Sequence, residues 1–294
     1  MLDYIEPVFR PPSEGRSLIL QVSNGCSWNN CSFCEMYQAP EKQFNFKPLE
    51  DIELELKKVA SAGVAIKKVF LADGDAMTLS SRRLLGILQL IRKYLPSVQR
   101  VSSYCLPRNL KNKSVEELAE LASYGLTLMY IGCESGDDLM LEKINKGETF
   151  QTSLDALTKI KLAGMKSSVM ILNGLGGSFY SEQHAVNSAK LMNEAQPEYL
   201  STLVVSFPTG EQRFVDAFGE GFLPLSQNEL FSEMNILLST LELEQTIFRS
   251  DHASNYLVLK GVLNKDKDRL LSQVDMAIND PNRIPLRQEW QRGL

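Results

Sequence analysis

Two patterns of apolar residues alternate over the first two thirds of the chain. Short apolar runs, such as residues 18–22, are typical of buried strands, whereas apolar residues spaced three and four positions apart are typical of amphipathic helices. Glycine and polar residues separate the two kinds of segment. The pattern predicts strands at 18–22, 67–72, 100–105, 126–132, 166–172 and 199–206, and helices at 49–62, 80–94, 114–124, 150–163 and 181–194.

Strands separated by helices need crossover connections, so neighbouring strands of this array should be parallel. Six such units suit a partial (β/α)6 barrel and a doubly wound sheet equally well, and both folds carry their site at the carboxyl ends of the strands. The alternation fails after Pro208, and helices are predicted further on, around 227–241 and 266–277. We therefore expect an α/β protein with an N-terminal arm at 1–16, a core at 17–214 and a mainly helical extension at 215–294 packed on the core.

The composition is that of an ordinary globular chain of 294 residues, with 44% hydrophobic and 23% charged residues. A net charge of −5 argues against a general nucleic-acid-coating role, although a local basic surface is compatible with it. One basic run lies between residues 80 and 114. We interpret it as a solvated helix face rather than a docking surface for RNA, an acidic protein or an electron donor. It contains eight basic residues and no acidic ones: Arg82, Arg83, Arg92, Lys93, Arg100, Arg108, Lys111 and Lys113.

The sequence carries no targeting signal that we recognise. Residues 1–7 have neither the basic region nor the apolar region of a secretory signal, and no apolar run approaches the roughly 20 residues that cross a bilayer. The five cysteines are an odd number and are clustered, which suits a reducing compartment better than a disulfide framework. These features predict a cytoplasmic protein without a membrane partner.

Three of the five cysteines fall within nine residues, directly after the first predicted strand. Cys26, Cys31 and Cys34 are spaced closely enough to place their thiolates around one soft-metal centre. Three protein ligands leave one coordination position open, which is typical of a catalytic rather than a structural metal site. Phe33 offers a flat apolar face beside such a centre.

This cysteine motif resembles that of the radical S-adenosylmethionine (SAM) superfamily, which has three cysteines with an aromatic residue just before the last. The first gap here is four residues, whereas three is the commonest number in that superfamily. The resemblance implies a six-stranded partial barrel in which Cys26, Cys31 and Cys34 bind one [4Fe-4S] cluster and Phe33 fills the aromatic position. Within the superfamily, the chain is most similar to the coproporphyrinogen-dehydrogenase and elongator-like branch.

The resemblance also implies SAM contacts at the ends of the second and fourth strands. Asp73, Gly74 and Asp75 follow the second strand, where the family binds the methionine amino group, although Asp75 or Ser80 could instead cap the next helix. Glu134 and Ser135 follow the fourth strand, and Glu134 matches a polar residue that faces the ribose. The alternative for Glu134 is a structural salt bridge.

Further candidates lie downstream of the fourth strand. Lys146 stands where the branch often has an arginine for the SAM carboxylate, although a solvated loop lysine is a simpler interpretation. Asn173 and Gly174 are similar to a glycine-containing segment near the adenine, and a tight turn alone would also explain them.

Other residues could line or close the site. Arg108 follows the third strand and could point into it. Arg249, Ser250 and His252 are faintly similar to the terminal serine motif of lipoyl synthases, and the alternative is a buried, hydrogen-bonded turn. Cys105 and Cys133 lie on predicted strands as small buried hydrophobes, so a second cluster is not expected.

The resemblance implies that an electron donor such as flavodoxin or ferredoxin reduces the cluster, and that SAM is then cleaved to methionine and a 5′-deoxyadenosyl radical, which abstracts hydrogen from a substrate. The substrate is unidentified. A small molecule is favoured because no RNA-binding module is recognisable, and RNA stays possible. Two alternatives remain open: a non-catalytic iron–sulfur or SAM-binding carrier or scaffold, and a zinc protein in which His252 completes a Cys₃His site.

Overall fold

The computed structural model describes residues 2–208, 210–219 and 221–292. They form two compact units, which we describe separately. Unit 1 comprises Met1–Asn29, Met36–Ile131 and Ala156–Ser167, and unit 2 comprises Asn30–Glu35, Gly132–Asp155 and Ser168–Leu294. This division falls inside the cysteine motif, because Cys26 belongs to unit 1 while Cys31 and Cys34 belong to unit 2. The expected boundaries after residues 16 and 214 stay a prediction.

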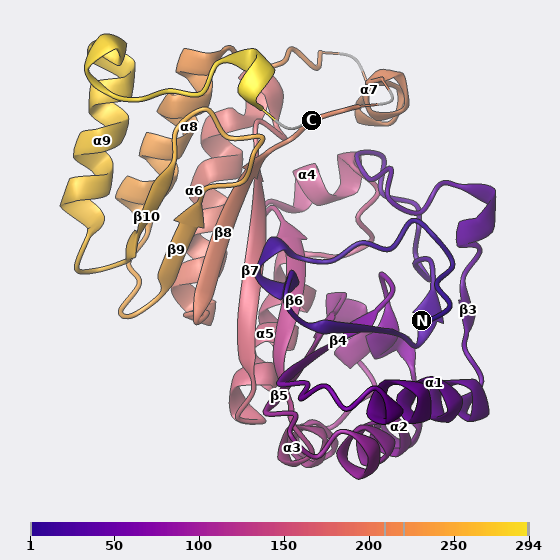
Figure 1. The fold of residues 1–294 in the computed structure, drawn as a ribbon. Helices are drawn as coiled ribbons and strands as arrows, with labels where there is room; N and C mark the ends of the chain where they lie inside the picture. Colours follow the sequence, from indigo (N-terminus) through magenta and orange to yellow (C-terminus); the bar gives the residue numbers. More distant parts are fainter. Residues whose placement is uncertain (1, 209, 220, 293–294) are drawn as a thin grey trace. The chain divides into compact units, whose positions relative to one another are not determined.

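Unit 1 is built on parallel strands in the order β1 (Leu18–Gln21), β4 (Lys68–Ala72), β5 (Arg100–Tyr104) and the first part of β6 (Leu126–Glu134). The strands are short and mostly buried, as expected for a parallel sheet. Three helices pack side by side along this sheet (Figure 1): α1 (Leu49–Ser61), α2 (Ser81–Tyr94) and α3 (Val115–Ser123). A small antiparallel pair, β2 (Ser23–Asn24) and β3 (Asn45–Phe46), follows β1 in the chain order.

The helix starts in unit 1 follow from local sequence. The hydroxyl of Ser80 accepts a hydrogen bond from the backbone nitrogen of Arg83 at 3.3 Å, so Ser80 caps α2 as predicted. Ser114 and Glu117 form a capping box at the start of α3, in which each side chain bonds to the other residue's backbone nitrogen. These caps satisfy backbone donors that the helices leave unpaired.

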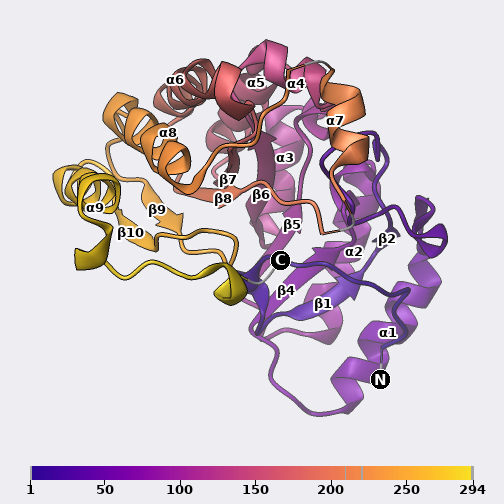
Figure 2. The same cartoon turned by 90° about the horizontal axis from the view of Figure 1, so that it is seen from above.

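Unit 2 continues the parallel arrangement with β7 (Lys166–Asn173), β8 (Tyr199–Val204) and β9 (Ile247–Ser250), and ends with β10 (Leu259–Val262) antiparallel to β9. The first two residues of β7 belong to unit 1. On one face of these strands lie α6 (Gly177–Ala195), α8 (Gln227–Thr240) and α9 (Lys267–Asn279), which pack against one another in sequence order (Figures 1 and 2).

Shorter elements complete the chain. Unit 2 also holds α4 (Asp138–Lys143) and α7 (Gln212–Phe218), and α5 (Phe150–Leu162) has residues in both units. Single 3₁₀ turns occur at Pro12–Glu14, Pro40–Lys42, Ala76–Thr78, Pro107–Leu110, Pro281–Arg283 and Glu289–Gln291. In the described part of the chain, no helix is both long and apolar enough to cross a membrane.

The predicted fold class is confirmed: the chain is α/β, and its strands are mostly parallel and alternate with helices. Each predicted strand and helix is present, with ends that differ from the prediction by a few residues. The sequence pattern did not predict β9 and β10, so the extension is less helical than expected. Each has only four residues, which is too short for a clear alternation, and each is stabilised by pairing with a strand distant in sequence or across a loop.

Candidate functional site

At the end of β4, Asp73 forms a buried ion pair within unit 1. Its carboxylate is fully buried and lies 2.6 Å from the ammonium group of Lys42, which is fully buried as well. Lys42 also donates to the backbone carbonyl of Ile5 at 2.6 Å and to the side chain of Asn24 at 3.3 Å. A buried charge of this kind needs a partner, and Lys42 supplies it. The fold of unit 1 therefore uses Oδ2 of Asp73, while Oδ1 has no hydrogen-bond partner among the described residues.

Asp75, two residues further on, forms no ion pair of this kind among the described residues. It is fully buried, and its Oδ2 accepts hydrogen bonds from the backbone nitrogen of Ser27, at 3.2 Å, and from the Ser27 hydroxyl. Its other oxygen, Oδ1, has no hydrogen-bond partner among the described residues. Burial raises the pKa of Asp75, and the hydrogen bonds from Ser27 oppose that shift. Asp75 is thus held against the residue that follows Cys26, with one acceptor unused.

Gly74 lies between the two carboxylates and meets an aromatic ring. A Cβ atom at this position would lie 2.4 Å from the ring of Tyr37, so only glycine allows the close contact. The ring also packs edge-on against Phe9. In unit 1, the side of Gly74 on which a side chain would lie is therefore occupied by Tyr37.

Arg108 also packs on the residues that follow Cys26. Its guanidinium lies 3.7 Å from the centre of the Trp28 ring, which is a close cation–π contact. The neighbouring Asn109 donates to the hydroxyl of Thr78 at 2.8 Å. Arg108 and Asp75 thus both approach the start of the cysteine motif from the ends of different strands.

Most side chains of the basic run between residues 80 and 114 contact other residues of unit 1. Arg83 and Arg92 lie over the rings of Phe46 and Tyr124, and Lys113 is buried and donates to the carbonyl of Met77 at 2.9 Å. Lys93 pairs with Glu53 and Arg100 with Glu14. Contacts of this kind engage six of the eight: Arg83, Arg92, Lys93, Arg100, Arg108 and Lys113.

In unit 2, the segment that carries Cys31 and Cys34 is held by residues outside the motif. The guanidinium of Arg213 donates to the carbonyls of Cys31 at 2.7 Å and Cys34 at 2.8 Å. The backbone nitrogen of Ser32 donates to the carbonyl of Ile144 at 2.9 Å. Sequence analysis missed Arg213 because it lies 182 positions from Cys31 and belongs to no local motif.

Phe33 and the short helix α7 share one apolar cluster. Phe33 packs against a group of buried side chains in unit 2. Phe214 and Phe218 of α7 belong to this group, with their ring centres 5.5 Å apart. The remaining buried members are Met140, Leu141, Ile144, Leu172 and Leu175. The aromatic residue of the motif therefore anchors its loop to the same core that fixes the helix carrying Arg213.

Glu134 and Lys146 form a buried ion pair, with 2.9 Å between Nζ and Oε1 and side-chain exposures of 8% and 4%. The interpretation of Lys146 as a solvated loop residue was wrong. Glu134 has a backbone φ of +65°, and it folds back so that a Cβ on Gly132 would lie 2.0 Å from its Oε1. Non-glycine residues rarely adopt this conformation. Gly132 is therefore required by the position of the Glu134 side chain.

The surroundings of this pair keep the lysine charged. Burial alone would lower the pKa of Lys146, but the carboxylate of Glu134 and the nearby Cys31 outweigh burial, and the pKa is raised. Lys146 also lies 5.8 Å from the centre of the Phe33 ring. The second oxygen of Glu134, Oε2, has no hydrogen-bond partner among the described residues. The pair is thus a structural salt bridge, and it leaves Oε2 of Glu134 as a buried acceptor without a hydrogen bond.

Ser135 is fully buried, and its hydroxyl is used within unit 2. Oγ lies 2.8 Å from Nδ1 of His184 and accepts a hydrogen bond from the backbone nitrogen of Asp137 at 3.0 Å. The other ring nitrogen of His184 faces the carbonyl of Leu172 at 2.9 Å. A carbonyl only accepts, so that nitrogen carries the hydrogen, and in a neutral ring Nδ1 accepts the Ser135 hydroxyl. These contacts tie the end of β6 to α6.

Asn173 and Gly174 at the end of β7 contact a residue that sequence analysis missed. Glu233 of α8 is 1% exposed and accepts a hydrogen bond from the backbone nitrogen of Gly174 at 2.7 Å. It also accepts from Nδ2 of Asn173 at 3.4 Å and from the hydroxyl of Ser181 at 2.6 Å. No local signal identifies Glu233, because its partners lie 52 to 60 positions away.

The residues expected to close the site belong to a hydrogen-bonded turn in unit 2. Asn255 donates to the buried hydroxyl of Ser250 at 3.0 Å, and Nδ1 of His252 lies 2.9 Å from the hydroxyl of Ser254. Burial, and then the charge of Arg287, lower the pKa of His252. Arg249 is exposed and donates to its neighbour's carbonyl, the Phe248 oxygen, at 2.9 Å. These contacts match the alternative of a turn, and a role in closing the site stays a prediction.

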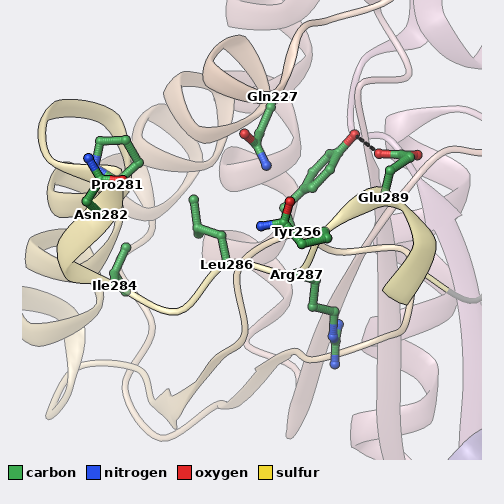
Figure 3. Close-up of a pocket in the computed structure, with 9 residues that line it drawn as sticks. Gln227, Tyr256, Pro281, Asn282, Ile284, Leu286, Arg287 and Glu289 are labelled. Carbon is green, nitrogen blue, oxygen red and sulfur yellow. Dashed lines mark hydrogen bonds between the residues drawn. The ribbon is translucent and has the colours of Figure 1, made fainter.

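A segment near the C-terminus fastens this turn. Arg287 donates to the carbonyls of His252, Asn255 and Asp251, and Arg292 stacks on the ring of Tyr256 at 3.9 Å. Figure 3 shows a pocket of about 600 Å³ beside it, where Tyr256 donates to Glu289. None of the expected site residues lines this pocket, which is formed by Gln227, Tyr256, Pro281, Asn282, Ile284, Leu286, Arg287, Gln288 and Glu289.

The cysteine side chains are chemically suited to binding metal, because none of the five forms a disulfide in the described residues. Cys105 and Cys133 are both buried as expected, but only Cys133 lies on a strand, because β5 ends at Tyr104. Burial raises the pKa of Cys133 to about 12. Within the described residues, no three His, Cys, Asp or Glu side chains lie close enough to hold one metal ion. The assignment of Cys26, Cys31 and Cys34 as ligands therefore stays a prediction.

Comparison with known proteins gives a family and a shared fold. The HemW heme chaperone of Bacillus subtilis is 24% identical over 180 residues, which are 60% of this chain and 46% of that protein. A putative methylthiotransferase of Methanocaldococcus jannaschii is 24% identical over 159 residues, which are 52% of this chain and 34% of that protein. The chain thus spans less than half the length of these curated relatives.

A solved structure has a similar fold. It is that of coproporphyrinogen III oxidase (HemN) from Escherichia coli, a radical SAM enzyme, with a TM-score of 0.56 and 15% identity, covering 76% of this chain and 52% of that one. This similarity is consistent with the partial barrel that the resemblance implies. Residues 20–191, more than half of the chain, match the radical SAM superfamily. The chain therefore belongs to the radical SAM superfamily.

Proposed function

We propose that this protein is an enzyme that binds one [4Fe-4S] cluster through Cys26, Cys31 and Cys34 and uses it to cleave SAM reductively. The observation that carries the proposal is the set of three cysteines within a segment that matches the superfamily, at residues 20–191. When bound, the cluster supplies the electron that splits SAM into methionine and a 5′-deoxyadenosyl radical, which takes hydrogen from a substrate.

The chain's own residues would orient SAM through buried acceptors at the strand ends. Asp75 is the better candidate of the two carboxylates after β4 for the methionine ammonium group, because Asp73 already has Lys42 as its partner. Glu134 Oε2 is a candidate acceptor for a ribose hydroxyl, with Lys146 fixing the carboxylate. Buried acceptors without hydrogen-bond partners among the described residues support a bound ligand, because such atoms are costly to leave unsatisfied; Oδ1 of Asp73 is a third.

The structure offers less support for the other residues that we expected to contact SAM or the substrate. Gly74 and Ser135 are occupied by protein contacts with Tyr37 and His184, so only their backbone would be left for SAM. Phe33 would pack beside the cluster while anchoring its loop. Arg108, Arg249, Ser250 and His252 are proposed at most as residues that line or close the substrate site.

For the substrate and the reductant, we propose only a chemical class and not a particular compound or protein. A small molecule is favoured as the substrate. The names of the relatives suggest tetrapyrrole chemistry and methylthiolation as two candidate reaction classes. RNA stays possible, although most side chains of the basic run already contact other residues of the protein. An electron donor such as flavodoxin or ferredoxin would be needed, since the protein must receive an electron for each SAM cleaved.

Metal analysis tests this proposal against its rivals. After anaerobic reconstitution, the wild type should hold about four iron and four sulfide ions per chain, as a [4Fe-4S] cluster requires. Cys31→Ala should lose the cluster and its visible absorbance, and the buried control Cys105→Ala should keep both. Stoichiometric zinc without iron would support the zinc alternative. A reducible cluster that binds SAM without forming 5′-deoxyadenosine would support a carrier.

A further inference from the structure

The turn after β9, residues 251–256, is fixed to the carboxyl end of β8 within unit 2. Because β9 pairs with β8 in parallel, both strands end at the same edge of the sheet. The side chain of Asn255 accepts a hydrogen bond from the backbone nitrogen of Val204 at 2.9 Å and donates to the carbonyl of Thr202 at 2.8 Å. Parallel α/β folds bind their ligands at this edge of the sheet. The turn therefore lies where a ligand is expected.

Ser254 fixes the tautomer of His252. Ser254 is 1% exposed, and its hydroxyl oxygen accepts a hydrogen bond from the backbone nitrogen of Val204 at 3.2 Å. The hydroxyl hydrogen is then available to Nδ1 of His252, which lies 2.9 Å away. The backbone nitrogen of Ser254 donates to the same Nδ1 at 3.1 Å. Because a backbone nitrogen can only donate, Nδ1 accepts, and the hydrogen of the neutral ring is on Nε2.

This arrangement keeps His252 neutral and leaves Nε2 as a donor. A second hydrogen on Nδ1 would face the backbone N–H of Ser254, so the protonated ring would lose its hydrogen bonds there. Burial and then the charge of Arg287 lower the pKa of His252, and the carboxylate of Asp251 opposes that shift. Among the described residues, Nε2 has no hydrogen-bond partner. The half-buried side chain therefore offers a ligand one N–H group held in a fixed direction.

The charges around the turn favour an anionic ligand, although the whole chain has a net charge of −5. The charged residues of β9, the turn, β10 and residues 287–292 are four basic and two acidic ones: Arg249, Lys260, Arg287, Arg292, Asp251 and Glu289. Both acidic side chains form ion pairs with basic ones of this group, and Arg287 donates to three carbonyls of the turn. Arg249 alternates with the buried Phe248 and Ser250, so its exposed side chain extends from the opposite face of β9. Since it forms no ion pair with another described residue, Arg249 remains available to an anion.

We infer that this turn binds an oxyanion of the substrate, a carboxylate or a phosphate, through the Nε2 hydrogen of His252 and the charge of Arg249. The inference rests on the proposed function, because it takes the carboxyl edge of the sheet as the substrate site of a SAM-cleaving enzyme. A hydrogen bond to a charged oxygen is about twice as strong as one between neutral groups, which favours an oxyanion over a neutral carbonyl. Ser254 is a positioning residue, because it acts through His252. The substrate is then a small acid.

Two amide substitutions at position 252 separate substrate binding from folding. Glutamine places an N–H near the position of Nε2, whereas asparagine places its amide near Nδ1, where it can keep the contact with Ser254. The readout is deuterium transfer from the low-molecular-weight metabolites of cells grown in deuterated water. A 5′-deoxyadenosyl radical that takes deuterium from the substrate gives monodeuterated 5′-deoxyadenosine, so coupled turnover is counted without knowledge of the substrate.

The two variants should differ in the amount of metabolite extract that gives half-maximal deuterium transfer. We expect His252→Asn to need about tenfold more extract than the wild type, and His252→Gln less than about threefold more. Without extract, both variants should form unlabelled 5′-deoxyadenosine at the wild-type rate, with an unchanged cluster content. If His252→Asn equals the wild type or surpasses His252→Gln, His252 only stabilises the turn and the inference is overturned.

The same extract tests the chemical class of the substrate. An anion-exchange resin should retain the deuterium donor, and loss of the donor after phosphatase treatment or after esterification identifies a phosphate or a carboxylate. Arg249→Gln should raise the half-maximal amount of extract about tenfold, whereas the exposed control Arg283→Gln should leave it unchanged. A donor that passes through the resin, or one that occurs only in the RNA fraction, overturns the inference.

The tautomer can be observed directly, because the chain contains only two histidines. In proton–nitrogen correlation spectra of the reconstituted protein near neutral pH, His252 should carry its hydrogen on Nε2. Ser254→Ala should raise the pKa of His252 and mix its tautomers, with the buried His184 as the internal control. A hydrogen on Nδ1 in the wild type overturns the inference. An iron-loaded wild type that forms no 5′-deoxyadenosine overturns the proposed function, whereas normal formation with any of these contrary results overturns the inference alone.

Discussion

Carboxylates at the ends of strands differ in what the protein does with them. Each of Asp73, Asp75 and Glu134 leaves one oxygen without a hydrogen-bond partner among the described residues. Asp73 and Glu134 each form an ion pair with a buried lysine, whereas the described residues show no ion pair for Asp75. The sequence placed all three as candidates and could not separate them, because their partners Lys42 and Lys146 lie outside the strand-end motifs. The separation depends on which lysine the fold brings into contact with each carboxylate.

The Glu134–Lys146 pair gives a prediction for stability. Lys146→Met should lower the free energy of unfolding by about 3–5 kcal/mol, because it leaves the Glu134 carboxylate buried without a cation. The double variant Lys146→Met/Glu134→Gln should be more stable than the sum of the two single changes predicts. Anaerobic urea denaturation of the cluster-free protein measures these free energies.

An exposed ion pair provides the control. Lys260 and Asp251 are 2.8 Å apart, with side-chain exposures of 55% and 36%, so Lys260→Met should cost less than about 1 kcal/mol. A loss at Lys146 as small as this, with additive effects in the double variant, would mean that the pair is not an energetically coupled part of the fold.

At the scale of elements, the long periodic segments were predictable and the short ones were not. Strands β1 and β4 and helices α1 and α2 follow local apolar spacing, and α2 also has the Ser80 cap, both of which the sequence displays directly. The four-residue strands β9 and β10 and the seven-residue helix α7 depend on contacts with distant parts of the chain. Arg213 was missed for this reason, since it reaches Cys31 and Cys34 only because Phe214 and Phe218 are buried.

The placement of α7 leads to a prediction about cluster retention. Arg213→Gln removes a forked donor that bonds to the carbonyls of Cys31 and Cys34. Two lost hydrogen bonds of about 0.5–1.5 kcal/mol each should loosen the loop. We expect a chelator to remove iron from the reconstituted protein about tenfold faster, since tenfold corresponds to about 1.4 kcal/mol.

Arg213→Lys should give an intermediate rate, because one ammonium group cannot reproduce the planar fork. Arg283→Gln removes an arginine with 73% side-chain exposure and serves as the matched control for the loss of one positive charge. Equal rates of iron loss in Arg213→Gln, Arg283→Gln and the wild type would show that α7 does not hold the cysteine segment.

At the scale of the whole molecule, the family match and the supporting contacts come from different parts of the chain. The match covers residues 20–191. Arg213, Glu233 and the turn held by Arg287 lie beyond residue 191, yet within unit 2 they reach the cysteine segment, the end of β7 and the end of β8. The region outside the match therefore supports candidate site residues within it. A family motif alone cannot reveal such support, because it contains none of these partners.

The central claim is that Cys26, Cys31 and Cys34 together make this chain a SAM-cleaving enzyme. The most direct measurement is the amount of 5′-deoxyadenosine formed per chain under anaerobic conditions with SAM and dithionite. The reconstituted wild type and Cys105→Ala should both form it, and Cys26→Ala, Cys31→Ala and Cys34→Ala should each form none above the level of a protein-free control. Equal amounts from the wild type and any of these three variants, or none from an iron-loaded wild type, would contradict the account.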